Sequence, residues 1–122
     1  MVATGEDDAS MQAAIGAVRA QIAFYASTPA YRVVLDVHGW GDLQPRLRDL
    51  TRSGDWAAMS SLVDDDLLHA VAVVAEPHQV ADEIRRRYRA VLDRVALNAP
   101  YVAPPEMWQQ IAFDLRQPTS NT

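Results

Sequence analysis

The sequence predicts a mainly α-helical fold with one or two short strands. Apolar residues recur at helical spacing along most of the chain, and residues typical of helix starts and ends separate these stretches. Only two short runs have the composition of a buried strand. With 122 residues, of which 49% are hydrophobic and 22% charged, the chain can bury a core. We expect a single domain at residues 1–117 and a disordered tail at residues 118–122.

The first helix is expected at residues 7–25. A Ser-Thr-Pro turn follows, in which Ser27 or Thr28 can cap the next helix and Pro29 suits its first turn, where no N–H is needed. Gly39 is expected to end this second, short helix. The apolar face of the first helix is predicted to contain Met11, Ile15, Val18 and Ile22.

Further helix starts are expected at three acidic positions and two prolines. Asp42 and Asp55 can each cap a helix, and the acidic run at 64–66 begins another that continues through Val74. Pro77 fits the first turn of a strong helix whose inward face is predicted to contain Val80, Ile84, Tyr88 and Val91. In this helix Glu83 is expected to pair with Arg87, four residues further on. Residues 105–115 return to helix.

The two short apolar runs predict strands. Val95–Asn98 lies between Asp93 and Pro100, and the opening MVATG is a possible second strand. One or two short strands cannot satisfy their own backbone donors and acceptors, and such strands between helices are typical of a β/α sheet with more members. The sequence therefore predicts that part of a sheet is missing.

Composition argues against several classes of function. A net charge of −5 and a pI near 5.0 disfavour nucleic acid and anionic membranes as partners. The chain has no cysteine, so a disulfide, a thiol nucleophile and a thiolate metal site are excluded. For Asp64–Asp66, helix capping is favoured over metal binding, and we expect no metal site. With no apolar run of membrane-spanning length and no signal-like opening, we expect a cytoplasmic protein.

Three segments occur in a characteristic order: QIAFYASTPAYRVVLDVHGWGDL, VVAEPHQVADEIRRRY and DRVALNAPY. Together they resemble the C-terminal third of luciferase-like oxidoreductases, of the monooxygenase family, that use the deazaflavin coenzyme F-420. The resemblance covers residues 2–115 and implies part of an eight-stranded β/α TIM barrel, from the end of strand seven to helix eight, with a helical insertion at 29–68. At 75–77 the chain has Ala-Glu-Pro where the family has Gly-Thr-Pro.

This resemblance implies hydride transfer between a deazaflavin and a small organic substrate, with flavin mononucleotide as the less favoured coenzyme. By this resemblance the chain lacks the first six strands and most of the loops that contact the coenzyme, so we expect it to be inactive alone. It is then expected to bind no coenzyme by itself, or to need a separate N-terminal half as its partner. The alternative is a non-catalytic helical interaction module that forms a homodimer through its exposed strand at 95–98.

Three side chains are candidates for catalysis and substrate binding at the barrel mouth. His38 is a candidate general acid or base, because histidine is the residue type that most often serves in that role, although a histidine beside a helix-ending glycine is also favoured by the helix dipole. Tyr31 and Trp40 are candidates for the substrate pocket. The structural alternatives are a core aromatic for Tyr31 and a plug in the helix joint for Trp40.

Three further residues are candidates for coenzyme binding. The hydroxyls of Ser27 and Thr28 can face an anionic group, although helix capping is the favoured explanation for both. Asn98 would lie at the C-terminal end of the last strand, where barrels place their chemistry.

Overall fold

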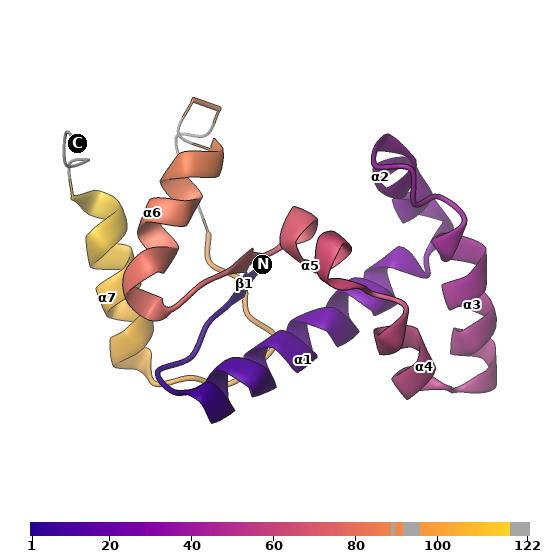
Figure 1. The fold of residues 1–122 in the computed structure, drawn as a ribbon, viewed down its shortest axis with the longest axis horizontal. Coiled ribbons are helices and arrows are strands. Elements are labelled where there is room, and N and C mark those ends of the chain that lie inside the picture. Colours follow the sequence, from indigo (N-terminus) through magenta and orange to yellow (C-terminus); the bar gives the residue numbers. More distant parts are fainter. Residues whose placement is uncertain (89, 92–95, 118–122) are drawn as a thin grey trace. The chain divides into compact units, whose positions relative to one another are not determined.

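The computed structural model describes residues 1–88, 90–91 and 96–117, and within them the fold is mainly helical with a two-stranded parallel sheet (Figure 1). This confirms the predicted fold class. The elements run in the order β1 (Val2–Ala3), α1 (Asp8–Ala26), a 3-10 turn (Pro29–Tyr31), α2 (Arg32–Val37), α3 (Leu43–Ser53), α4 (Trp56–Ser61), α5 (Asp65–Val71), β2 (Val73–Val74), α6 (Pro77–Tyr88) and α7 (Pro105–Arg116).

The chain divides into two compact units. The first unit comprises residues 1–15 and 72–122, and the second comprises residues 16–71, so α1 contributes to both. The single domain expected at residues 1–117 stays a prediction, and the tail at 118–122 lies outside the described residues. No described helix combines the length and the apolar character that crossing a membrane requires.

The sheet of the first unit is a β–α–β–α arrangement. β1 pairs in parallel with β2, with Val2 opposite Val73 and Ala3 opposite Val74. The Val73 N–H donates to Met1 O at 3.0 Å, and the Ala75 N–H donates to Ala3 O at 3.2 Å. Because parallel strands need a long crossover, α1 and the second unit lie between the two strands in sequence.

The strand β2 corrects a prediction. Val74 was expected within the helix that begins at the acidic run, but α5 ends at Val71 and the chain then extends. Two consecutive β-branched residues favour an extended backbone once a partner strand is present. That partner is β1, which lies some seventy residues earlier in the chain, so local spacing does not reveal it.

The strand expected at Val95–Asn98 is wrong for its described part. Val95 lies outside the described residues, and residues 96–98 have no regular strand structure. Even so, Asn98 O accepts a hydrogen bond from the Val2 N–H at 3.1 Å. One backbone bond is too few to extend the ladder into a third strand.

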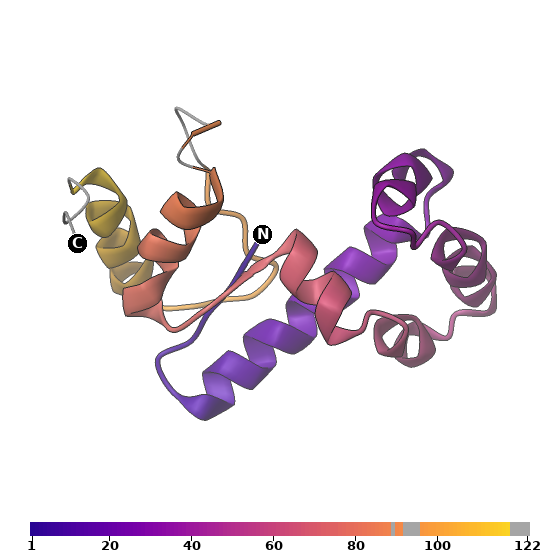
Figure 2. The ribbon, with the colours of Figure 1, turned by 45° about the horizontal axis from the view of Figure 1, so that its top comes forward.

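The core of the first unit lies between the sheet and the two helices α6 and α7, which lie side by side (Figure 2). Val80 and Ile84 are buried as predicted, whereas Val91 is 75% exposed because α6 ends at Tyr88. Each buried aliphatic side chain contributes about 1.5–3 kcal/mol relative to an exposed one. The buried cluster consists of Val2, Val73, Val80, Ile84, Met107 and Ile111.

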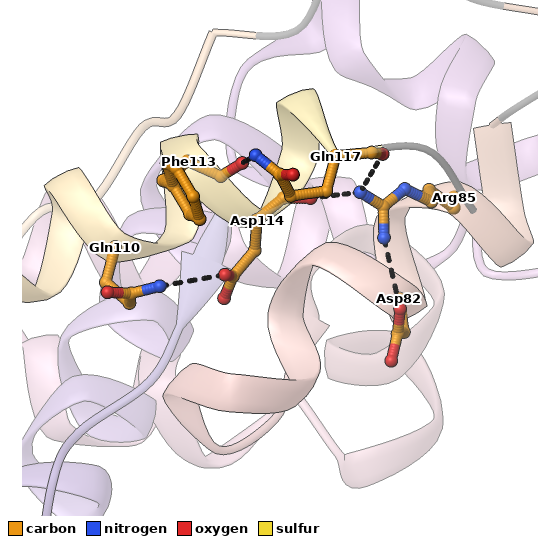
Figure 3. A network of polar contacts seen from close by, with 6 residues as sticks. All are labelled: Asp82, Arg85, Gln110, Phe113, Asp114 and Gln117. Carbon is orange, nitrogen blue, oxygen red and sulfur yellow. Dashed lines mark hydrogen bonds and ion pairs between the residues drawn. The ribbon is translucent and has the colours of Figure 1, made fainter. Parts of the chain in front are cut away.

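One arginine fastens α6 to the end of α7 (Figure 3). The Arg85 guanidinium donates to the carbonyl oxygens of Asp114 and Gln117, the latter at 2.9 Å, and also contacts the Asp82 carboxylate at 3.1 Å. The last carbonyls of a helix have no partner within the helix and carry partial negative charge, so a cation stabilises this end.

A second charged group fastens α6 to the start of β2. The Glu83 carboxylate accepts from Arg86 at 2.5 Å and from Arg87 at 2.9 Å, and Arg87 also donates to Ala72 O at 2.9 Å. The hydrogen bond from Arg86, followed by that from Arg87, lowers the pKa of Glu83 to about 2. The predicted pairing of Glu83 with Arg87 is confirmed.

The second unit is a small helical assembly with buried side chains of its own. Arg19 on α1 donates to Val63 O at 2.5 Å and pairs with Asp65 at the start of α5. The Gln44 amide donates to Ser27 O at 3.0 Å, which joins α3 to the turn after α1. The buried side chains include Val18, Ile22, Leu35, Leu47, Met59 and Leu67.

Helix ends in the second unit agree only in part with the expected caps. Asp55 accepts from the Ala58 N–H at 3.1 Å, as predicted, and Gly54 has a φ of 72°. Thr28 lies at the start of the 3-10 turn, but its hydroxyl donates back to Tyr25 O at 2.7 Å. The short turn leaves few free N–H groups, so this hydroxyl closes the end of α1 instead.

Replacing Arg85 by alanine should lower the free energy of unfolding by about 1–3 kcal/mol, because it leaves helix-terminal carbonyls without a charged donor. The control is Arg48→Ala, which removes an exposed arginine of α3 and should cost less than about 1 kcal/mol. Urea unfolding followed by circular dichroism gives both values. Equal losses would show that the contacts of Arg85 with α7 contribute nothing.

Stability should fall in acid partly through Glu83. Its pKa in the folded chain lies below the ordinary 4.5, so its contribution is complete above pH 4.5 and is lost as the pH falls towards about 2. Glu83→Gln should therefore flatten the decline of the urea midpoint between pH 5 and pH 2.5. The change Asp49→Asn, at an exposed carboxylate inside α3, serves as control, and an unchanged slope in Glu83→Gln would refute the prediction.

Candidate functional site

The candidate site lies at the C-terminal edge of the parallel strand pair. Residues 4–7 lead from the end of β1 into α1, and residues 75–76 lead from the end of β2 into α6. Parallel β/α folds place their ligand sites at this edge, because the loops and helix N-termini converge there. The start of α7 also borders the same space.

A hollow of about 580 Å³ occupies this edge. It is lined by residues from the first turns of α1, α6 and α7 and by the two loops that follow the strands. The lining is strongly acidic, so we name it the acidic hollow. Its carboxylates come from Glu6, Asp7, Asp8, Glu76 and Glu106.

The charge of the acidic hollow disfavours an anionic ligand. Helix N-termini carry partial positive charge and by themselves attract phosphate. At the start of α1 a side-chain carboxylate already takes the place of such an anion. Asp7 accepts from the Ser10 N–H at 2.7 Å, and this bond lowers the pKa of Asp7. Among the described residues, the lining contains no arginine, and its one histidine, His78, lies 3.6 Å from the carboxylate of Glu76.

Gly5 allows the loop after β1 to pack tightly against α1. A Cβ at this position would lie 2.4 Å from Met11 N and 2.6 Å from the carbonyl carbon of Ser10. These are backbone atoms and cannot move aside cheaply. The close approach of loop and helix at one wall of the acidic hollow therefore requires glycine.

A smaller cavity of about 170 Å³ adjoins the same loop. Thr4 and Tyr101 line it, and the Tyr101 hydroxyl accepts from the Thr4 N–H at 3.1 Å and donates to Val2 O at 2.8 Å. Burial raises the pKa of Tyr101, so the phenol keeps its proton at neutral pH. Thr4 is 1% exposed, and within the described residues its Oγ1 has no hydrogen-bond partner.

The predicted coenzyme-binding residues are not among those that line the acidic hollow. The buried Ser27 hydroxyl donates to Phe24 O at 2.6 Å, and the exposed Thr28 hydroxyl donates to Tyr25 O. Both belong to the second unit. Asn98 is exposed and belongs to the first unit, where its carbonyl meets Val2. Their role in coenzyme binding stays a prediction.

The predicted catalytic and substrate residues belong to the second unit. Tyr31 stacks on Tyr25 with ring centroids 6.4 Å apart, and His38 stacks on Trp40 at 5.3 Å. His38 follows the last residue of α2, and Gly39 after it has a φ of 80°. The structure thus brings His38 together with Trp40, and it holds Tyr31 against a different aromatic ring. Their functional roles stay predictions.

Sequence reasoning missed the acidic hollow and the pair of Thr4 and Tyr101. The acidic residues of the hollow come from three segments that are far apart in the sequence, so no local pattern groups them. A usable signal existed, because Glu76 replaces a neutral residue of the resembled family directly after a strand. In the part of the chain that the structure describes, no group of three or more potential ligands is arranged to hold a metal ion.

Comparison with known proteins gives two kinds of match. A model of the family described as luciferase-like monooxygenase matches residues 1–94. Among curated proteins, the chain is similar to three uncharacterized proteins: Mb1395 of Mycobacterium bovis, and MT1405 and Rv1360 of Mycobacterium tuberculosis. Each is 56% identical over 95 residues, which are 78% of this chain but only 28% of the relative. No solved structure matches the chain significantly.

Two glycine-to-alanine changes should have opposite effects on stability. Gly5→Ala should lower the free energy of unfolding by about 1–3 kcal/mol, because its Cβ collides with the backbone of α1. Gly16→Ala, in the interior of the same helix with nothing within 4 Å of its Cβ, should raise it by about 0.5–1 kcal/mol. Urea unfolding measures both, and a neutral Gly5→Ala would contradict the tight packing of the loop.

Proposed function

Because the chain belongs to the luciferase-like monooxygenase family, we propose that it is the C-terminal part of an F-420-dependent oxidoreductase that is inactive by itself. The proposed reaction is hydride transfer between the deazaflavin and a small organic substrate. The observation that carries the proposal is the family match over residues 1–94, which includes both strands and the loop residues of the acidic hollow that follow them.

The number of strands that a closed barrel requires supports the proposed inactivity of the isolated chain. A β/α barrel closes only when each strand has two neighbours, and eight strands supply the loops around one site. The described residues contain two strands. The matched region spans 28% of the length of the curated relatives, which leaves room in those proteins for the remaining strands.

The residues of the acidic hollow do not fit the phosphate of a flavin-type coenzyme. A phosphate needs N–H donors or cationic side chains, whereas this edge presents five carboxylates and one histidine. We therefore infer that other strands of the complete barrel would hold the coenzyme. The contribution of this chain would be one wall of the site, on the side of the organic substrate.

A second candidate function is a non-catalytic interaction module that forms a homodimer. The observation that favours it is a set of exposed apolar side chains on α2 and the end of α1. Val33 is 70% exposed and Val37 78%, and Phe24 is 51% exposed. Such exposure in one helical unit favours a protein partner over solvent.

The F-420 proposal is tested by fluorescence titration of two proteins with both F-420 and flavin mononucleotide. One is this chain alone. The other joins it to the portion of Rv1360 that lies outside the matched region. We expect no saturable binding by the chain alone, and binding by the joined protein with at least about tenfold preference for F-420, which corresponds to 1.4 kcal/mol.

Three outcomes separate the alternatives. Preference of the joined protein for flavin mononucleotide would overturn the choice of coenzyme. Saturable binding by the chain alone would overturn its inactivity. Failure of both proteins to bind either coenzyme, together with a dimeric mass of the chain in the same buffer, would favour the interaction module.

A further inference from the structure

The short helix α2 in the second unit has one buried side and one exposed apolar side. Leu35 is buried and fixes the inward side of the helix. At 3.6 residues per turn, Val33 and Val37 lie on the opposite side, one turn apart, and both are mostly exposed. The two valines form an outward column that the described part of the chain leaves in solvent.

Two side chains of opposite charge run along one flank of this column. Arg32 and Asp36 directly precede the two valines in sequence, so they too lie one turn apart, and both are exposed. The Arg32 guanidinium lies 4.0 Å from the Asp36 carboxylate and 3.7 Å from that of Asp42. Exposed pairs at such distances contribute little to stability, so their arrangement is not explained by the folding of this chain.

The other flank of the column is apolar. Val34 lies there, and Tyr31, three residues earlier, lies on the same side of the chain. Tyr31 stacks on Tyr25 with ring centroids 6.4 Å apart, and Phe24 meets Tyr25 edge-on at 6.0 Å. Because Val34, Tyr25 and Phe24 are all exposed, apolar surface continues from α2 to the end of α1.

The order of the charges makes this face complementary to itself in one orientation. When two copies of α2 pack antiparallel about a two-fold axis, equal flanks meet and the chain direction is reversed. Arg32 of each copy then comes opposite Asp36 of the other, and the two valine columns meet beside these pairs. Parallel packing about a two-fold axis would instead bring the charged flank of each copy against Val34 of the other.

We propose that the exposed face of α2, formed by Arg32, Val33, Asp36 and Val37, binds a second copy of this chain in the antiparallel orientation. We name it the self-docking face. The inference rests on the second candidate function, the homodimer, for which it identifies the contact surface and the orientation. It is independent of the coenzyme.

The size of the self-docking face determines how firmly two copies hold together. The six residues of α2 span about 9 Å. Such a short helix buries less than the roughly 800 Å² per partner of a standard interface, even with the aromatic rings beside it. We therefore expect a dimer that dissociates on dilution, so sedimentation is measured over a range of concentrations.

Charge reversal tests the pairing across the interface. Arg32→Glu and Asp36→Arg each place like charges opposite each other in a dimer of the variant. We expect either change to raise the dissociation constant of the dimer by about tenfold. An equimolar mixture of the two variants should dimerise about as tightly as the unaltered chain, because both pairs across the interface are then opposite in charge.

The mixture separates pairing between copies from effects within one copy. Each variant also loses the ion pair within its own helix, and mixing cannot restore that pair. No recovery in the mixture would therefore overturn the proposal. The matched control is Arg48→Glu, the same reversal at an exposed arginine of α3, and an equal weakening by this change would show that net charge alone acts.

A second measurement leaves both charged side chains in place. The chain has no cysteine, so Val33→Cys and Val37→Cys each introduce a single thiol, at an exposed position. In the antiparallel orientation, position 33 of one copy lies opposite position 37 of the other, and a disulfide needs Cβ atoms about 4 Å apart. The two variants, one of them ¹⁵N-labelled, are mixed, oxidised and analysed by mass spectrometry.

Disulfides between the two variants should form in excess of their statistical share, and a statistical mixture or an excess of disulfides between identical chains would contradict the antiparallel orientation. The sedimentation data also distinguish this inference from the function on which it rests. A dimer that neither charge variant weakens would mean that another surface is used: the homodimer stands and the self-docking face is wrong. A chain that stays monomeric at millimolar concentration would overturn both.

Discussion

The first unit depends on the pairing of the backbone groups on the edge of β1 that faces away from β2. The two residues of β1 lie between β2 on one side and residues 98–101 on the other. Buried N–H and C=O groups without partners cost about 1–3 kcal/mol each. The ladder with β2 satisfies one edge, and Asn98 together with Tyr101 satisfies the other. With both edges paired, the buried cluster under α6 and α7 can form around a strand pair that would be marginal alone.

Charge organises the same unit around this pair. The carboxylates at the C-terminal edge face three helix N-termini, and Arg85 occupies the C-terminal end of α7, so side chains oppose the helix dipoles at both ends. This arrangement stabilises the helices and also determines what the edge can bind. An edge whose positive helix ends already meet carboxylates does not favour the binding of phosphate.

How much of this follows from the sequence depends on how far apart the partners are. The helices, the Asp55 cap and the Glu83–Arg87 pair arise from residues within one helical turn, and these predictions are confirmed. β2 forms only by pairing with β1, which is distant in the sequence, so local spacing alone predicts that its two valines belong to the end of a helix. Tyr101 meets Val2 and Thr4 across almost the whole chain, and no local pattern marks it. The acidic hollow likewise exists only once parallel topology assembles residues that each resemble an ordinary helix start.

The order of segments around β1 can be observed directly in a chain of 13.5 kDa by NMR detection of scalar couplings across hydrogen bonds. The account predicts couplings from the Val73 N–H to Met1 C=O and from the Ala75 N–H to Ala3 C=O, and a further one from the Val2 N–H to Asn98 C=O. The account would be contradicted if the first two couplings were observed but Asn98 C=O coupled to an amide of β2 instead of to the Val2 N–H. That result would leave the Val2 N–H, on the edge of β1 that faces away from β2, without the backbone partner described here.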